Sequence, residues 1–337
     1  MNFLSVGDLS RFLSLRRANS ALRNDIQALS KAVTTGVHAD IPRHLGGDTL
    51  DLSRLEGGIR ETEAFRRTTR EAAATASGMQ AAFGILQDIA DTSSANMLSD
   101  TSLAVEHTLQ SVASVADSQL GSAIDALNTN VGGRFLFSGM KANTPPIISA
   151  SDLIAQAQSV IAGATSPAEA VQRLDTWFTG AVGSGGFSDN AYNGSLEGGS
   201  KFGIDASTTI QFEQTANDQG IRRTLLGLTL GALVSRGAFA GDLAAQAAMM
   251  RAGGAALMKG STSITQSRAA LGSHEQTIER TAVRVENLAA ELMIERTNLI
   301  SVDTYEVGSR LVQSEATLEA LYAMTARLSG LSLAKHL

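Results

Sequence analysis

Apolar residues recur at every seventh position near both ends of the chain. Near the N-terminus, one heptad position holds Phe12, Ile26 and Val33, and the other holds Leu15, Leu22 and Leu29. The C-terminal part has a longer series with a spacing of seven: Leu271, Ile278, Val285, Leu292 and Leu299. Leu288 and Val302 stand on the companion heptad position. A seam of this kind predicts a long helix that needs a partner helix. We therefore expect the two ends of the chain to pair with each other.

Prolines and polar turns set the boundaries of the predicted helices. The chain has only 4 prolines, and proline costs about 3 kcal/mol inside a helix. The resulting proline-free tracts predict helices over about 10–33, 48–91 and 99–130. Residues 151–180, which include Pro167, look helical again but less regularly. The polar segment Thr92-Ser93-Ser94 is expected to form the turn between the second helix and the third.

The second half of the chain predicts two more helical parts. A pair of helical segments is expected over about 219–258, and Gly253-Gly254 and Gly260 are expected to separate it from a terminal helix that begins near Ser261. This terminal helix is expected to flex around Asp303-Thr304 and to resume from Tyr305. Alternation predicts short strands at about 135–137 and 209–213.

These elements predict a mostly α fold with a small β portion, arranged as an elongated, nested, antiparallel bundle of long helices. Residues 1–41 with 300–337 would form a terminal coiled-coil assembly domain. Residues 42–140 with 215–299 would form a helical rod domain with a short β-hairpin. Residues 141–214 would form a small central tip domain.

Composition narrows the class of protein. The chain of 337 residues has a formal net charge of -6 and no long basic run, so we expect no nucleic-acid partner. It has no cysteine, which excludes disulfides and thiolate metal sites. The chain contains no run of about 18 apolar residues, the length needed to span a membrane. Asp8 and Arg11 interrupt what would be the apolar core of a secretory signal. The arginines of residues 11–23 would also fit a transit peptide, but the heptad continues unbroken through them.

Few residues suggest chemistry. His38, Asp40 and His44 have metal-ligand side chains, but they flank Pro42 in a turn and lack a fourth ligand, so we expect no metal and no cofactor. An enzyme would need a site in the central region, where Trp177, Asp189 and Tyr192 are the only candidates. A membrane-active helical protein is a third class, although no continuous apolar span supports it. The terminal seams instead indicate an assembly protein without catalytic residues or a small-molecule substrate.

Three segments resemble the flagellin superfamily and, within it, the hook-associated protein 3 family that joins hook to filament. Residues 130–139, Asn-Val-Gly-Gly-Arg-Phe-Leu-Phe-Ser-Gly, look like that family's Gly-Arg-aromatic-Leu/Ile-Phe-Ser/Ala-Gly signature. Residues 302–306 and 318–328 are similar to the C-terminal helix that flagellins and hook-associated protein 3 share. Residues 29–36 are similar to the Leu-Ser-(Ser/Thr)-Gly segment near the end of the first helix.

The resemblance covers about residues 1–145 and 205–337, and it implies a structural component of the bacterial flagellum. It implies export by the flagellar type III pathway without a cleaved signal, and an extracellular location in the flagellum. The expected partners are further copies of the chain in a ring or helical assembly, a neighbouring hook-associated protein, flagellin and an export chaperone. Flagellin itself, the filament subunit, is the alternative.

We predict that the terminal seams make the axial contacts of this assembly. The same stripes could instead form only an intramolecular bundle core. The predicted interface residues are Phe12, Leu15, Leu22, Ile26, Leu29, Leu311, Leu318, Leu321, Leu328 and Leu331.

Overall fold

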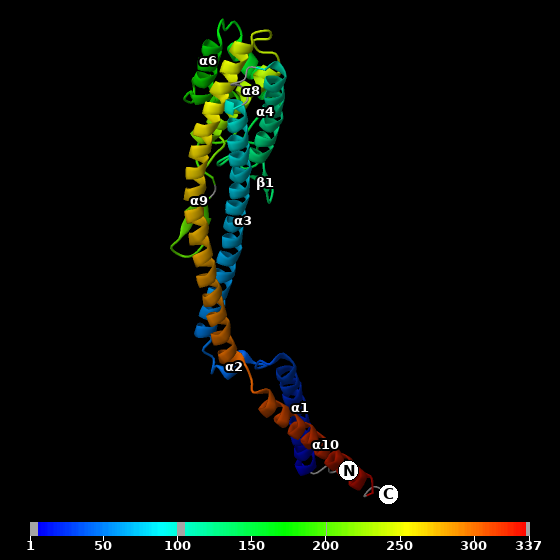
Figure 1. The fold of residues 1–337 in the computed structure, drawn as a ribbon. Helices are drawn as coiled ribbons and strands as arrows, with labels where there is room; N and C mark the ends of the chain where they lie inside the picture. Colours follow the sequence, from blue (N-terminus) through cyan, green and yellow to red (C-terminus); the bar gives the residue numbers. More distant parts are fainter. Residues whose placement is uncertain (1–5, 100–104, 200, 335–337) are drawn as a thin grey trace. The chain divides into compact units, whose positions relative to one another are not determined.

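The computed structural model describes residues 6–99, 105–199 and 201–334, and most of them are helical. The helices are α1 (Val6–Thr35), α2 (Ile41–His44), α3 (Leu50–Ser99), α4 (Glu106–Leu127), α5 (Ala150–Ile161), α6 (Pro167–Thr179), α7 (Phe187–Asn190), α8 (Gln219–Ser235), α9 (Leu243–Ile300) and α10 (Thr304–Ala334). The strands form two antiparallel hairpins: β1 (Asn130–Val131) with β2 (Arg134–Phe135), and β3 (Lys201–Gly203) with β4 (Thr209–Gln211). The prediction of a mostly α fold with a small β portion is confirmed (Figure 1).

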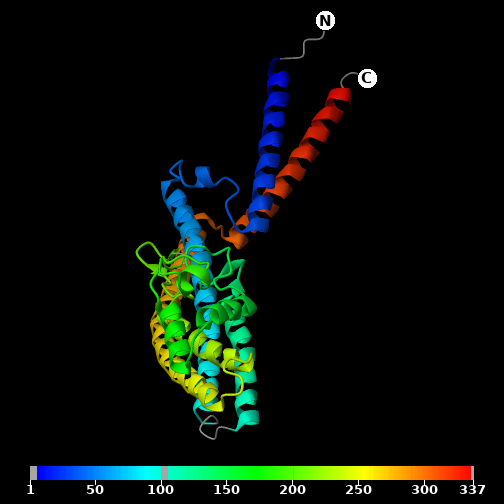
Figure 2. The ribbon, with the colours of Figure 1, turned by 90° about the horizontal axis from the view of Figure 1, so that it is seen from above.

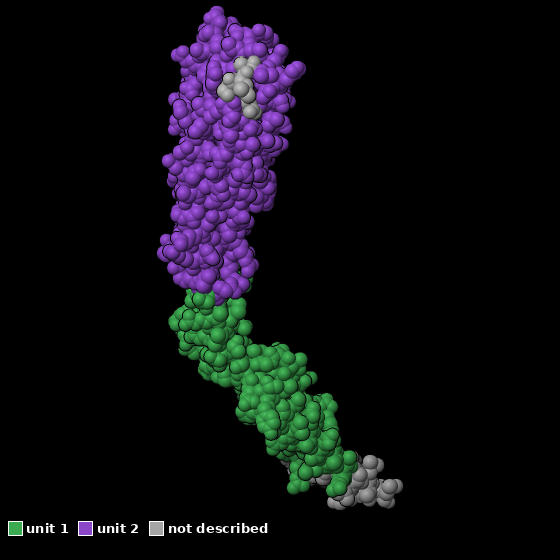
Figure 3. Space-filling view, viewed as in Figure 1, with its two compact units in different colours: residues 1–63, 287–337 green, residues 64–286 purple. Residues whose placement is uncertain are grey.

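The chain divides into two compact units (Figure 3). Unit 1 comprises Met1–Glu63 with Asn287–Leu337, and unit 2 comprises Ala64–Glu286. Unit 1 therefore combines segments from the two ends of the sequence, whereas unit 2 is one continuous segment. The predicted division into three parts, with residues 141–214 as the tip, stays a prediction.

Helix α3 carries a heptad seam that large apolar residues alone do not reveal. Seven residues spaced seven apart along it are all buried: Leu55, Thr62, Thr69, Ala76, Phe83, Ala90 and Met97. Four of the residues three positions further on are buried as well: Ala72, Met79, Leu86 and Ser93. Alanine, threonine and serine at these positions let a second helix approach closely but give little hydrophobic signal in the sequence.

In unit 2, α9 packs antiparallel along this seam. Arg66 pairs with Glu286, with its Nε 2.9 Å from the carboxylate, and the Ser261 hydroxyl donates to Asp91 at 2.6 Å. Arg66 and Asp91 are 25 residues apart on α3, and Ser261 and Glu286 are also 25 residues apart on α9. The two helices therefore keep one register over this length.

One predicted position of the α9 seam is wrong. Leu271, Ile278 and Val285 are buried as predicted, but Leu288, predicted on the companion position, is 45% exposed. Ala289, four residues after Val285, is buried in its place at 3% exposed. A straight α-helix advances 3.6 residues per turn, so the fourth residue lies as near the seam as the third, and the small alanine fits the close contact there.

Two helix boundaries were wrongly predicted from local composition. Thr92-Ser93-Ser94 lies inside α3, where Ser93 and Ser94 are buried and the Ser94 hydroxyl donates to the Asp91 carbonyl at 3.0 Å. A serine that bonds back to its own helix is compatible with an uninterrupted helix.

Helix α9 begins at Leu243 rather than near Ser261, and it runs through Gly253, Gly254 and Gly260 without a break. At these glycines α9 lies close to its neighbours. A Cβ on Gly227 of α8 would lie 2.6 Å from the Gly253 carbonyl oxygen, and one on Gly254 would lie 2.8 Å from the Leu98 side chain. They serve close helix packing instead of ending the helix.

In the chain between α4 and α8, helices α5 and α6 pack on α8, and α8 packs on α4. Arg222 of α8 fixes the end of α6, because its guanidinium donates to the carbonyls of Phe178 and Gly180 at 3.1 Å each. The predicted strand at 209–213 is β4, and its partner β3 has no comparable signal in the sequence. The predicted strand at 135–137 is displaced, because only Phe135 of that segment belongs to β2.

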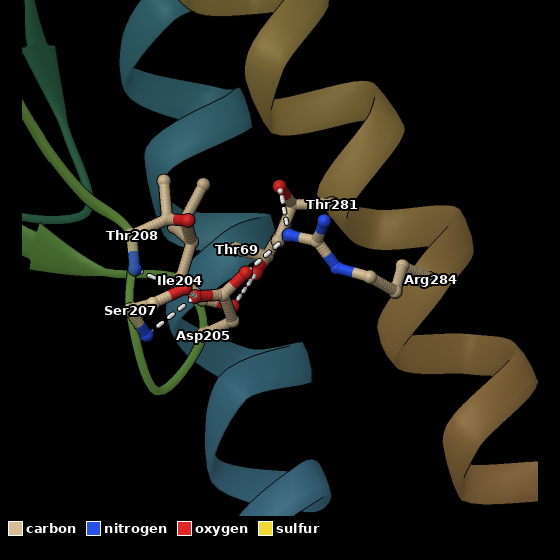
Figure 4. A network of polar contacts seen from close by, with 7 residues as sticks. All are labelled: Thr69, Ile204, Asp205, Ser207, Thr208, Thr281 and Arg284. Atoms are coloured by element: carbon tan, nitrogen blue, oxygen red, sulfur yellow. Dashed lines mark hydrogen bonds and ion pairs between the residues drawn. The ribbon is translucent and has the colours of Figure 1, made fainter.

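The tip of the β3–β4 hairpin is attached to both long helices (Figure 4). Thr69 of α3 donates to the Ile204 carbonyl at 3.3 Å, and Arg284 of α9 forms an ion pair with Asp205. Desolvation by burial raises the pKa of Asp205, but hydrogen bonds from Ser207 and Thr208 outweigh it and lower that pKa to about 2. The hairpin thus joins α3 and α9 where the α3 seam carries a threonine.

Candidate assembly interface

Helices α1 and α10 of unit 1 pack against each other. Figure 2 shows that they lie together where α1 ends and α10 begins, and that they diverge toward the other ends of the two helices. On α1 the half-buried positions follow each other in steps of three and four: Leu15, Asn19, Leu22, Ile26, Leu29 and Val33. On α10, Val307 is buried, and the positions that follow in the same steps are half-buried: Leu311, Ser314, Leu318 and Leu321. The predicted pairing of the two chain ends is confirmed, with α10 as the partner of α1. The series from Leu271 to Leu299, which was expected to meet the N-terminal helix, lies instead on α9, and α9 packs on α3.

Backbone hydrogen bonds fix one end of this pair. Val37 and Ser301 form an antiparallel bridge, and the Val302 amide donates to the Gly36 carbonyl at 3.0 Å. Gly36 has φ +72°, a conformation that suits glycine at the end of a helix. Asp303 then caps α10, because its carboxylate accepts the amide hydrogens of Tyr305 and Glu306. The helix is interrupted at residues 301–303, next to the point where flexing was predicted, and the flexing itself stays a prediction.

A polar contact links the two helices further along. Arg23 donates to the Tyr322 hydroxyl at 2.6 Å from Nη2 and at 3.0 Å from Nε, and its guanidinium carbon lies 5.8 Å from the centre of the Tyr322 ring. Both side chains are exposed, so this contact orients the helices more than it stabilises them.

The pair covers its own seam only in part. Leu22, Ile26, Leu318 and Leu321 face the partner helix, yet each remains half-exposed. By contrast, Val285 on the α9 seam is 3% exposed. Two helices alone leave the sides of their seam open to water, so the α1–α10 pair has apolar surface available for a further helix.

The structure brings together seven of the ten predicted interface residues on these facing positions: Leu15, Leu22, Ile26, Leu29, Leu311, Leu318 and Leu321. The side chains of Phe12, Leu328 and Leu331 lie outside the described part of the chain. The role of all ten in assembly stays a prediction.

The 130–139 segment ties the hairpin β1–β2 to the central region. Phe137 is buried edge to face against Phe83 of α3, with ring centres 5.2 Å apart. The Ser138 carbonyl accepts a hydrogen bond from the Ser195 amide at 2.8 Å. Gly139 has φ +60°, and a Cβ there would lie 2.6 Å from the Ser195 carbonyl oxygen. These contacts give the three residues at the end of the segment a structural role.

A groove of about 520 Å³ lies between α3 and α9 in unit 1. Its lining comprises Asp51, Arg54, Leu55, Leu292, Glu295, Asn298 and Leu299. Sequence reasoning placed Leu292 and Leu299 in a seam but did not predict this groove. The signal that was present is the pair of exposed acidic residues, Glu291 and Glu295, beside those leucines.

The candidate metal ligands do not assemble a metal site. His38 and His44 stack with ring centres 3.6 Å apart, and burial together with His44 lowers the pKa of His38. Asp40 instead caps α2 by accepting the Arg43 amide hydrogen at 3.1 Å. Across the described residues, no group of three or more His, Cys, Asp or Glu side chains could hold a metal ion.

The three candidate catalytic residues have structural contacts. Trp177 packs edge to face on Phe178, with ring centres 4.9 Å apart. Asp189 accepts the Gly183 amide hydrogen at 2.8 Å, and this hydrogen bond lowers its pKa. Tyr192 donates to the Ser195 carbonyl at 2.7 Å, and burial raises its pKa to about 12. Each of the three side chains therefore helps to hold the central region together.

Over the ranges that the structure describes, no helix combines the length and apolarity that crossing a membrane requires.

No protein-family model matches the chain, and no curated protein matches it in sequence. Among solved structures, the chain is similar to one described as "putative flagellar hook-associated protein from Vibrio parahaemolyticus". The TM-score is 0.41 at 12% sequence identity, and the alignment covers 72% of this chain and 96% of that chain.

Proposed function

We propose that the chain is a structural subunit of the bacterial flagellum that joins the hook to the filament by axial packing of α1 and α10. The observation that carries the proposal is the seam of this pair, whose apolar residues face each other but stay half-exposed. Burying one large apolar side chain contributes about 1.5 to 3 kcal/mol, so a neighbouring subunit that covers the seam would gain binding energy.

The resemblance of residues 29–36, 130–139 and 302–328 to flagellar proteins supports the same proposal. On this proposal the chain is exported by the flagellar type III pathway without a cleaved signal and lies outside the cell. Its partners are further copies of itself, a neighbouring hook-associated protein, flagellin and an export chaperone. The chain acts by packing and not by catalysis.

Filament flagellin is the second candidate, because the C-terminal resemblance is common to both families. The 130–139 segment favours the junction protein. Deletion of the coding region in the source bacterium, followed by electron microscopy of the cells and assay of the medium for flagellin, separates the two candidates. Hooks without filaments, with flagellin in the medium, support the junction role. Absence of flagellin from both cells and medium supports the filament role, and normal flagella contradict both.

Substitutions in the seam test the mechanism. Leu22→Asp and Leu321→Asp place a carboxylate where the proposed contact is apolar, so we expect incorporation into isolated flagella to be lost while unit 2 of the purified chain stays folded, as its amide hydrogen exchange measures. Ala21→Asp and Ala320→Asp are the matched controls, because these neighbouring positions are exposed. Normal incorporation of the leucine variants would refute the mechanism.

A further inference from the structure

The groove between α3 and α9 in unit 1 has an apolar floor that is incompletely covered. Leu292 and Leu299 continue the heptad of Ile278 and Val285, but they are only half-buried. Leu288, one turn before Leu292, adds an exposed apolar side chain on the same helix. The floor therefore offers apolar surface for a further helix.

The rim of the groove is acidic. Arg54 forms an ion pair with Asp51 at 3.1 Å, which leaves the charge of Glu295 uncompensated within the lining. Glu291 lies one turn before Glu295 and is also exposed. Among the described residues, no ion pair involves either glutamate. A fitting partner helix would thus present apolar and basic side chains together.

The N-terminal half of α1 has this character. Residues 10–24 contain four arginines, Arg11, Arg16, Arg17 and Arg23, and no acidic residue. Leu13 precedes the seam residue Leu22 by nine residues, which places it on the opposite side of the helix, and it is 43% exposed. Arg16 and Arg17 are both exposed one turn away from Leu13.

We infer that the groove receives the N-terminal half of α1 from a second copy of this chain, with Leu13 on the leucine floor and Arg16 and Arg17 beside Glu291 and Glu295. The inference rests on the proposed function and names the partner of its assembly. Donor and acceptor are different surfaces, so the contact is heterologous and repeats from copy to copy into a ring or a helix.

The donor cannot come from the same copy. Arg17 lies eighteen residues from the end of α1 at Thr35, which is about 27 Å of helix. Glu295 lies only six residues from Ser301, and Ser301 pairs with Val37 directly after α1. The donor residue therefore lies about 27 Å of helix from this bridge and the groove residue only about 9 Å, so the donor half of α1 does not reach the groove of its own copy.

Cysteine cross-linking tests the contact directly, because the natural chain has no cysteine. The double variant Arg17→Cys with Glu295→Cys is oxidised both in isolated flagella and as the purified full-length chain at high concentration. The expected product is a ladder of dimers, trimers and longer multimers, since each copy carries one donor and one acceptor. Each single-cysteine variant is the control and should stay monomeric, because the inferred contact joins position 17 only to position 295 and the natural chain has no cysteine.

A result limited to monomers and dimers in both samples would overturn the inference, and so would cross-links only to a different flagellar protein. If the chain is absent from flagella, the proposed function fails, and the purified chain alone decides whether this contact forms. The two failures are thus distinguishable.

Charge exchange provides a second measurement that does not depend on cysteines. Arg17→Glu and Glu295→Arg should each lower the amount of chain retained in isolated flagella about two- to fivefold, as expected for one partly exposed ion pair. The combination of both should restore it, because the charges are only exchanged. Equal retention of all four proteins, or no recovery in the combined variant, would contradict the contact.

Discussion

At the scale of residues, glycines hold the central region together by letting backbones approach each other. Gly139 combines a left-handed backbone with a near contact to the Ser195 carbonyl oxygen, and Gly227 lies against Gly253 between two helices. An alanine at either position would have to displace backbone atoms, which cannot rotate away as a flexible side chain can.

We expect Gly139→Ala to lower the free energy of unfolding by about 2 to 4 kcal/mol, because left-handed strain and overpacking add at this position. Gly163→Ala is the matched control. Gly163 has φ +73° with nothing within 4 Å of a Cβ. Gly163→Ala should therefore lower the free energy of unfolding only through left-handed backbone strain, by about 1 to 2 kcal/mol. Urea unfolding of the three proteins measures the difference, and equal losses would show that close packing against the Ser195 and Glu197 carbonyl oxygens is unimportant.

At the scale of elements, the β3–β4 hairpin links two helices that are far apart in sequence. Asp205 orders the tip through Ser207 and Thr208 and pairs with Arg284 of α9, while Thr69 of α3 bonds the neighbouring carbonyl. The hairpin thereby covers the α3 seam at Thr69, where the seam has a threonine instead of a large apolar side chain.

We expect Asp205→Asn to destabilise unit 2 by about 1 to 2 kcal/mol at pH 7, since it weakens charge-assisted hydrogen bonds that are partly open to water. The pKa of Asp205 falls from 3.8 to about 2 on folding, so this stabilisation is present above pH 3.8 and is lost as the pH falls toward 2. Unfolding curves of both proteins should therefore begin to approach each other at about pH 4 and meet at about pH 2. Glu197→Gln, at an exposed position, is the control, and a difference that does not depend on pH would contradict the role of the carboxylate.

The elements also show how much the sequence could predict. The terminal seams and the break at Asp303 were predictable, because leucine periodicity and a capping aspartate are local signals. The path of α9 through Gly253 and Gly260 was not, because those glycines are explained by α8, which only the tertiary structure places beside them. The acidic groove was missed for the same reason, since Leu288 has the periodicity of a seam residue and only the structure shows that it is exposed.

At the scale of the whole molecule, burial is uneven between the two helix pairs. The α3 and α9 seams contain many buried residues, whereas the described part of the α1–α10 seam has Ala32 and Val307 as its buried apolar residues. An isolated pair with so little buried surface gains little against its ordering entropy.

We expect amide hydrogen exchange in the purified chain to be much faster in α1 and α10 than in residues 70–97 of α3 and 257–285 of α9. Exchange followed by mass spectrometry measures this directly. In isolated flagella the two terminal helices should gain protection while the other two change little. Similar protection of all four helices in the purified chain would contradict the expectation.

Because α3 and α9 keep one register, their length can change without a change in the contacts between them. Because the facing positions repeat every seven residues on both helices, a heptad removed from both at the same level would restore the same neighbours, whereas a heptad removed from one would misalign all contacts beyond it. Matched removal or addition of heptads should therefore change the length of α3 and α9 while the residues outside them keep their contacts.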